Sequence, residues 1–260
     1  MGALALVVGL GGAPAAADEC ASYGVRATID GLADGDVVPA NGRLRVGLFR
    51  SCGEPEGAVE HELRLVGPGG AAIEVERVVW GASFVEVAPR GRLGPGRHRL
   101  EVRRPLGGAN LGPWEALVEV EVGGADEQGG PRFAGIAEAR ARAVPGAIML
   151  SPCEATTDWV IETSLSFETA VDDLPHDRLL YALDRRRGPA EAWQEVMVFR
   201  PEIEGAGRGR VAFTEDFGWS ERWEYRIRVR DLGGYEVAGA RTAAVTVPGR
   251  PKRPVPPWRR

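Results

Sequence analysis

The chain has 260 residues, of which 44% are hydrophobic and 27% charged, as expected for a folded globular protein rather than a disordered or membrane-embedded one. This length accommodates two domains of ordinary size. The net charge is −5, but five basic residues lie within positions 248–260, so residues 1–247 carry a net charge of −10. An acidic body argues against general nucleic-acid binding, which requires a basic face.

Residues 1–17 have the pattern of a secretory signal peptide. Positions 3–12 form an apolar run of suitable length, and Ala15, Ala16 and Ala17 supply the small residues of a cleavage site. We expect export to the periplasm, the cell surface or the medium, with an uncleaved or mis-assigned start as the alternative. No later stretch is apolar and long enough to span a bilayer, so we predict no transmembrane segment.

Alternation of apolar and polar residues predicts short strands in the first half. Leu44, Val46 and Leu48 share one face, and Arg43 and Arg45 lie on the other. The predicted strands cover 25–29, 44–48, 59–66, 72–80, 83–89, 97–104 and 114–122. Seven strands at this spacing indicate an immunoglobulin-like sandwich over residues 18–122.

A second series of strands follows a glycine-rich linker at 123–133. These strands are expected at 135–144, 147–150, 158–171, 177–185, 191–203, 209–215, 221–231 and 240–247. The segment 135–144 also suits a helix, since Ala, Glu and Arg favour one, but we interpret it as an edge strand. Residues 134–247 therefore form a second sandwich. The proline-rich basic tail at 248–260 favours polyproline II or disorder.

Two segments resemble known families. DGDVVPANGRLRVGL and SFVEVAPRGRLGPGRHRLEV, within residues 25–122, resemble the Ig-like modules of bacterial surface and surface-layer proteins. WEYRIRVRDLGGYEVAGARTAAVTV at 223–247 is similar to the last strands of a fibronectin type III module, with Tyr225, Ile227 and Val229 facing inward. These resemblances imply an all-β protein of two tandem sandwiches. They also imply binding, spacing or adhesion roles without a family-wide catalytic residue.

Three aspartates form a possible acidic site. Asp30, Asp34 and Asp36 offer hard oxygen ligands at alternate positions, as calcium requires. Asp and Gly also build turns by accepting backbone hydrogen bonds and adopting positive φ. The closing Glu of an EF-type loop is absent. We therefore interpret the stretch as a turn and predict no metal site.

The chain contains three cysteines, and an oxidising compartment would pair two of them. If residues 24–49 fold as an antiparallel pair centred on Asp36, a constant register places Cys20 opposite Cys52 and within disulfide reach. We predict a Cys20–Cys52 disulfide. The alternatives are a Cys52–Cys153 bond and no bond. With the first pairing, Cys153 is free or pairs with another chain.

Aromatic and basic residues near the C-terminal end suggest a binding face. Trp and Arg are common in protein hot spots and on carbohydrate platforms. The candidate face comprises Trp193, Trp219, Arg226, Arg228 and Arg230. The stretch WSERW is similar to the tryptophan–arginine ladder of cytokine-receptor fibronectin modules. The alternative is core packing, which we favour for Trp223 and Tyr225.

These patterns predict a non-enzymatic, exported binding or structural protein of a bacterial envelope or extracellular assembly. Its partner would be another such protein or a glycan, and its basic tail could contact an anionic surface. A carbohydrate-binding protein and a small secreted enzyme or accessory domain with carboxylate chemistry are the alternatives. No zinc, nucleotide or nucleophile motif occurs, so we predict neither catalytic residues nor cofactors.

Overall fold

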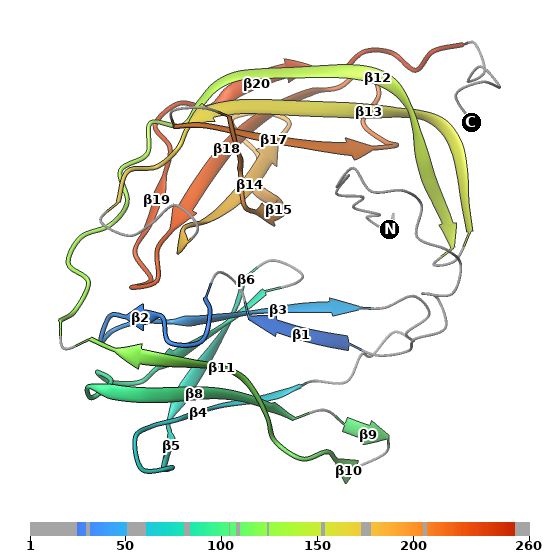
Figure 1. Ribbon diagram of the computed structural model, residues 1–260. Coiled ribbons are helices and arrows are strands. Elements are labelled where there is room, and N and C mark those ends of the chain that lie inside the picture. Colours follow the sequence, from blue (N-terminus) through green and yellow to red (C-terminus); the bar gives the residue numbers. More distant parts are fainter. Residues whose placement is uncertain are drawn as a thin grey trace.

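The computed structural model describes residues 25–29, 32–50, 61–80, 84–103, 105–107, 110–123, 125–151, 154–172, 178–204 and 207–252. The chain is all-β over these ranges, and its strands form two sandwiches packed against each other (Figure 1). We call them the first and the second sandwich, in chain order. No helix in the described part is long and apolar enough to cross a membrane.

The first sandwich pairs a sheet of order β1-β3-β7-β6 with one of order β2-β11-β8-β4-β5. The first order is the A-B-E-D arrangement of an immunoglobulin fold. The strands of these two sheets are β1 (Val25–Ile29), β2 (Val37–Val38), β3 (Leu44–Arg50), β4 (Glu62–Val66), β5 (Ala72–Ile73), β6 (Val75–Trp80), β7 (Phe84–Pro89), β8 (Gly96–Arg103) and β11 (Glu115–Val122). A separate pair is formed by β9 (Pro105–Gly107) and β10 (Asn110–Leu111).

The second sandwich repeats this arrangement. One sheet has the order β12-β13-β17-β16, and in the other β15-β14-β18 continues to β19 and β20, which both pair with β18. The strands are β12 (Ile136–Ser151), β13 (Glu154–Glu168), β14 (Leu180–Arg186), β15 (Gln194–Phe199), β16 (Glu202–Glu204), β17 (Arg208–Glu215), β18 (Arg222–Arg230), β19 (Glu236–Ala238) and β20 (Ala243–Thr246). The prediction of two tandem Ig-like or fibronectin III-like sandwiches is confirmed.

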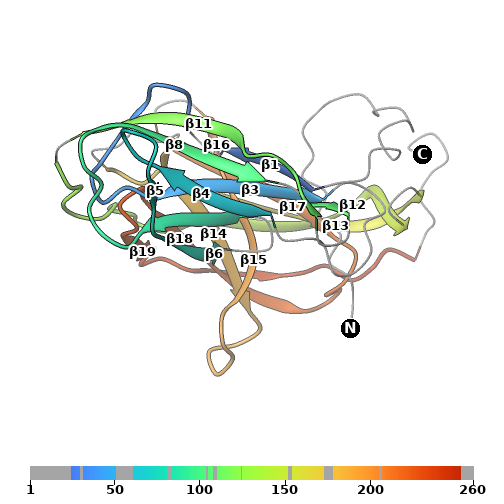
Figure 2. The same ribbon diagram turned by 90° about the horizontal axis from the view of Figure 1, so that it is seen from below.

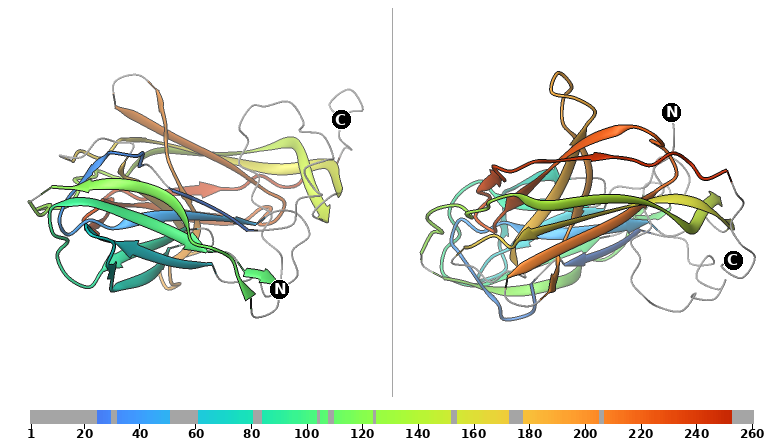
Figure 3. Two further views of the ribbon diagram at one scale, coloured as in Figure 1. Left: turned by 60° about the horizontal axis from the view of Figure 1, so that its bottom comes forward. Right: turned by 90° about the horizontal axis from the view of Figure 1, so that it is seen from above.

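Two long strands extend beyond the second sandwich. Strand β12 is a single edge strand, so the expected segments at 135–144 and 147–150 are continuous, and the edge-strand interpretation is right. Pro145 is accommodated because an edge strand has one side without ladder bonds. Figures 1 and 3 show the β12–β13 hairpin running past the sheet and bending at its far end.

The cores follow the predicted alternation. In the first sandwich Leu44, Val46, Val85 and Val87 are buried. In the second, Trp223, Tyr225, Ile227 and Val229 on β18 all face the core, which confirms the interpretation of Trp223 and Tyr225 as core residues. An aromatic cluster joins the two sheets through ring centroids 5.6–6.2 Å apart. Its members are Phe133, Phe167, Tyr181 and Phe199.

The register of β1 against β3 differs from the one assumed for the disulfide. Paired residue numbers add to 75, as for Val25 opposite Arg50, whereas Cys20 opposite Cys52 requires 72. The register argument is therefore wrong by three positions. Cys20, Cys52 and Cys153 lie outside the described residues, as do 1–17 and 253–260, so the disulfide, the signal peptide and most of the tail stay predictions.

A glycine in β17 sets the packing of one core ring. Gly209 lies opposite Phe167, and an added Cβ would meet the Cε2 atom of that ring at 2.4 Å. We predict that Gly209→Ala lowers the free energy of unfolding by about 1–3 kcal/mol, because the ring must leave its rotamer. Urea denaturation measures this. Gly188→Ala, where an added Cβ meets nothing within 4 Å, is the control, and equal effects of both changes would contradict the packing argument.

Candidate functional site

The two sandwiches meet at a junction built on β3 and β7 of the first and on the ends of β14 and β18 of the second. Arg45 on β3 lies opposite Glu86 on β7, and both side chains are 0% exposed. Alternation predicted that Arg45 would face away from the first core, and it does. That face is covered by the second sandwich, so the charged pair lies in an interior (Figure 1).

Arg45 connects the two sandwiches through its guanidinium group. Its Nε donates to Glu86 Oε1 at 3.2 Å. Its Nη1 donates to the Arg178 carbonyl oxygen at 3.0 Å, and its Nη2 donates to the carbonyl oxygens of Arg230, at 3.0 Å, and Asp231. These three carbonyls belong to the second sandwich, and buried carbonyls require donors. One side chain therefore satisfies backbone groups at two strand ends of its neighbour.

Glu86 receives positive charge from both sandwiches. Besides Arg45, it pairs with Arg43 at 3.5 Å and with Arg230 of the second sandwich at 3.1 Å. A reciprocal contact comes from Arg178, which pairs with Asp36 at 3.0 Å and donates to the Val37 carbonyl at 2.8 Å. The junction is thus a network of ion pairs rather than a single bridge, and networks stabilise more reliably than isolated pairs.

An apolar side chain completes the junction. Leu232, in the turn between β18 and β19, is 1% exposed and belongs to the core of the first sandwich. The Arg43 backbone N–H donates to its carbonyl oxygen at 2.7 Å. Gly234 follows with φ +87°, and an added Cβ would meet Arg43 Nε at 2.3 Å. The glycine lets the turn lie directly against Arg43.

The stretch that contains Asp34 and Asp36 forms a turn, as the sequence analysis predicted. Asp36 Oδ2 accepts a hydrogen bond from the Ala33 N–H, Asp34 Oδ1 accepts one from the Glu119 N–H, and Gly35 has φ +84°. Asp30 lies outside the described residues. Asp36 has a second role that the sequence did not indicate, since it pairs with Arg178 across the junction.

A different group of acids lies beside the junction. Glu127, Asp172 and Asp231 each place one carboxylate oxygen within 4.8 Å of the others. Glu127 comes from the segment expected to be a linker, and Asn41 holds its backbone through two hydrogen bonds of 3.0 and 3.3 Å. Burial raises the pKa of Asp231, although the N–H groups of Tyr235 and Gly234 and the charge of Arg45 act in the opposite direction.

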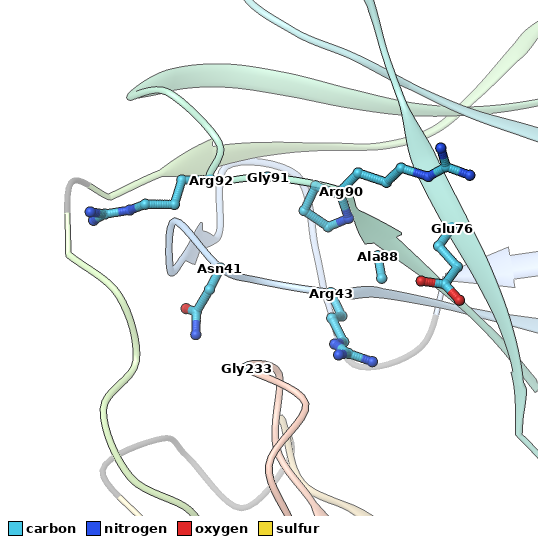
Figure 4. Close-up of a pocket in the computed structure, with 9 residues that line it drawn as sticks. Asn41, Arg43, Glu76, Ala88, Arg90, Gly91, Arg92 and Gly233 are labelled. Carbon is cyan, nitrogen blue, oxygen red and sulfur yellow. The ribbon is translucent and has the colours of Figure 1, made fainter.

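A hollow of about 520 Å³ adjoins the junction, lined by residues that include Asn41, Arg43, Glu76 and Gly233 (Figure 4). Its two other arginines, Arg90 and Arg92, extend in opposite directions away from Gly91. They pair with Glu74 and with Asp126, respectively. The lining groups do not converge on one point, as an active site requires.

Arginine–tryptophan stacks cover part of the second sandwich. The Arg186 and Arg226 guanidinium carbons lie 4.3 and 4.6 Å from the Trp193 ring centroid. Trp193 directly precedes β15, and the connection from β14 to β15 projects from the body in Figures 2 and 3. Trp223 is stacked in the same way by Arg185 at 4.5 Å and Arg187 at 5.0 Å. Such contacts hold a guanidinium over a ring while leaving it able to bind carboxylates.

The structure brings only some of the five predicted face residues together. Trp193, Arg226 and Arg228 belong to one surface, where both arginines pair with Asp184 at 2.7 and 2.8 Å. Trp219 is half-buried against the second core, and Arg230 lies at the junction with Glu86. The sequence pattern missed Arg45, Glu86 and Leu232, because each fits an ordinary strand or turn position.

Comparison with known proteins gives matches only among solved structures. Neither a protein-family model nor a curated protein matches it. Among solved structures, the FN1-FN3 domains of chicken CNTN1 give 11% identity and a TM-score of 0.27 over 87% of this chain and 65% of that one. Domains A168-A170 from titin give 12% identity and a TM-score of 0.24 over 84% of this chain and 64% of that one. This chain spans just under two thirds of each. The two sheet orders themselves define it as a protein of two Ig-like or fibronectin III-like sandwiches.

The buried guanidinium gives a direct stability prediction. Arg45→Met leaves three carbonyls of the second sandwich without their donor and removes a partner of Glu86. We predict a loss of about 3–5 kcal/mol in unfolding free energy, the usual cost of breaking a buried pair. Urea denaturation followed by tryptophan fluorescence measures this. Arg97→Met is the control, because Arg97 is 78% exposed and pairs with Glu119 at 3.3 Å. A loss no larger than in the control would contradict the assigned role.

An ion pair on the outer face predicts a pH dependence. Hydrogen bonds from Arg186 and then Thr242 lower the pKa of Glu224 below 4.5. A lowered folded-state pKa contributes stability above the unfolded-state pKa, and this is lost as pH falls through the folded-state value. We predict that Glu224→Gln costs about 0.5 kcal/mol at pH 7, and that the difference disappears in acid. Thermal unfolding from pH 7 to pH 3 tests this, and a difference independent of pH would contradict it.

Proposed function

We propose that the protein is a non-enzymatic binding or structural component of an envelope or extracellular assembly, and that its two sandwiches act as one rigid unit. The observation that carries the proposal is the junction, where Arg45 is buried against three carbonyls of the second sandwich. A rigid pair of sandwiches presents its surfaces to a partner at a fixed separation. The signal-peptide pattern of residues 1–17 supports export.

The distribution of carboxylates favours binding over catalysis. Glycosidase-type chemistry needs two carboxyl groups that reach one substrate. Of the close acids Glu127, Asp172 and Asp231, Asp172 lines a hollow, and the other two are buried. Glu101 and Glu215 are engaged by arginines. These arrangements give the carboxylate-enzyme alternative no support.

The surface around Trp193 is the candidate contact for a partner. It combines an indole ring, the guanidinium groups of Arg226 and Arg228 and the carboxylates of Glu195 and Glu236. Trp and Arg at a projecting position are the residues that dominate protein interfaces. The charged groups of this surface already pair with one another. A bound partner would replace some of these ion pairs with ion pairs to its own charged groups.

A protein partner fits this surface better than a glycan. A sugar platform needs an indole face open to solvent, whereas the described tryptophan side chains are half-buried or buried. They are Trp114, Trp159, Trp193, Trp219 and Trp223. Two guanidinium groups also occupy the space over the Trp193 ring. We therefore place the glycan alternative second.

Site-specific cross-linking in the native host tests the proposal. A photoreactive phenylalanine analogue at position 193 should capture one partner, and the same analogue at position 114 should not. Trp114 is a matched control, because its ring is stacked by Arg64 and Arg103 on the first sandwich. The captured partner is then purified, and Trp193→Ala is predicted to weaken its binding by about 30-fold, as expected for a hot spot of 2 kcal/mol.

Two results would contradict this assignment. One is that the Trp193→Ala variant binds the purified partner with the same affinity as the wild type. The other is cross-linking at position 114 with none at position 193. Catalytic turnover of a glycan by the purified protein would instead favour the enzyme alternative.

A further inference from the structure

Three carboxylates from separate segments meet beside the junction. Glu127 comes from the segment between the sandwiches, Asp172 follows β13, and Asp231 follows β18. One oxygen of each lies within 4.8 Å of the others. Calcium–oxygen distances of about 2.3–2.6 Å allow two ligands of one ion to lie at most about 5 Å apart. The spacing of these oxygens is therefore compatible with a single calcium ion.

Asp231 provides an observation independent of this clustering. Its side chain is 0% exposed, and its Oδ1 accepts a hydrogen bond from the Tyr235 N–H at 2.8 Å. Its Oδ2 is buried and has no hydrogen-bond partner among the described residues. No arginine or lysine of the described ranges forms an ion pair with this carboxylate. A buried carboxylate oxygen without a donor is costly unless a cation or a proton compensates it.

The neighbouring arginines are directed elsewhere. Arg45 Nη2 donates to the main-chain carbonyl of Asp231, and its Nε donates to Glu86. Arg43 and Arg230 also pair with Glu86. Three arginine side chains of the junction therefore pair with Glu86.

Both sandwiches hold Glu127 in place. Asn41 of the first sandwich accepts from the Glu127 N–H and donates to its carbonyl oxygen. Gly233 of the second sandwich lies so close that an added Cβ would be 2.8 Å from Glu127 Oε2. An ion bound at this point would contact a ligand fixed by both sandwiches, and its binding would stabilise their docked arrangement.

The cluster reaches a hollow through Asp172, and its chemistry is that of hard oxygen donors. Asp172 lines a hollow of about 410 Å³ together with Gln128 and Gly130, and this hollow opens to solvent. The cluster consists of three carboxylates and contains no histidine or cysteine among the described residues, which favours calcium over zinc or copper. Water in the hollow can supply the remaining ligands that calcium requires.

We propose that Glu127, Asp172 and Asp231 bind one calcium ion, which links the segment between the sandwiches to the second sandwich and stabilises the junction. This proposal does not depend on the partner-binding face around Trp193. It also differs from a calcium site at Asp30, Asp34 and Asp36, where Asp36 accepts a backbone hydrogen bond within the turn and Asp34 accepts one from the Glu119 N–H on β11.

Calorimetry and thermal unfolding of the full chain test the proposal. After treatment with EDTA, added CaCl2 should bind with a stoichiometry of one and raise Tm by several degrees. Asp172→Asn should abolish both effects while folding normally, because Asp172 lies at the edge of the hollow. Glu202→Gln, at an exposed position on β16, is the charge-matched control and should retain both.

Terbium luminescence locates the ion. Tyr235 adjoins Asp231, so terbium bound at this site should emit when tyrosine is excited, and CaCl2 should displace it. Tyr235→Leu should reduce the emission and leave the calcium-dependent rise in Tm intact.

Three results would overturn the site. One is the absence of binding heat and of a change in Tm with CaCl2. Another is an equal effect of CaCl2 on the wild type and on Asp172→Asn, which would indicate ionic strength. The third is a stabilisation by Asp172→Asn at pH 7 without any calcium effect, which would indicate that the acids share a proton.

Discussion

The arrangement of the two sandwiches depends on the hydrogen bonds and the ion pair made by the guanidinium group of Arg45. This group is fully buried, paired with Glu86 and hydrogen-bonded to carbonyls at residues 178, 230 and 231. The planar fork of arginine can serve several acceptors in fixed directions, which a lysine cannot. A buried ion pair gains little net stability over apolar residues, because both charges lose their hydration. Here the pair fixes the orientation of the second sandwich relative to the first. The three carbonyl oxygens must lie in the directions in which the guanidinium N–H groups point.

The same chemistry recurs over the second sandwich. Arg185 stacks on Trp223 and pairs with Glu215, a residue whose pKa is raised by burial although Arg185 opposes this. Burial likewise raises the pKa of Tyr225 to about 12. Because Lys252 is the only lysine, nearly every cation of the chain is a guanidinium that can stack and bind a carboxylate at once. The outer face of β18 therefore carries an ordered network of ion pairs, and Trp193 stacks on it through Arg226.

Strand positions and core faces follow from the sequence because both depend on local alternation. Trp223, Tyr225 and Ile227 could be assigned to the core for that reason, whereas the edge position of β12 was interpreted from 135–144 without Pro145, the residue that suits an edge strand. The junction could not be predicted, because Arg45 and Glu86 alternate as solvent-facing residues do, and only a second sandwich makes that face an interior. The position of Glu127 could not be predicted either, for a different reason. It lies in a glycine-rich segment that suggested a free linker, whereas Asn41 and Gly233 hold it from both sides.

Residual dipolar couplings of the full chain test the central claim, that the junction fixes the two sandwiches as one body. We predict that amides of the first and of the second sandwich, fitted separately, give alignment tensors of the same magnitude and orientation. That result would hold only if the contacts of Arg45, Glu86 and Leu232 persist in solution. Tensors of different magnitude or orientation would show that the sandwiches move independently, and would contradict the account.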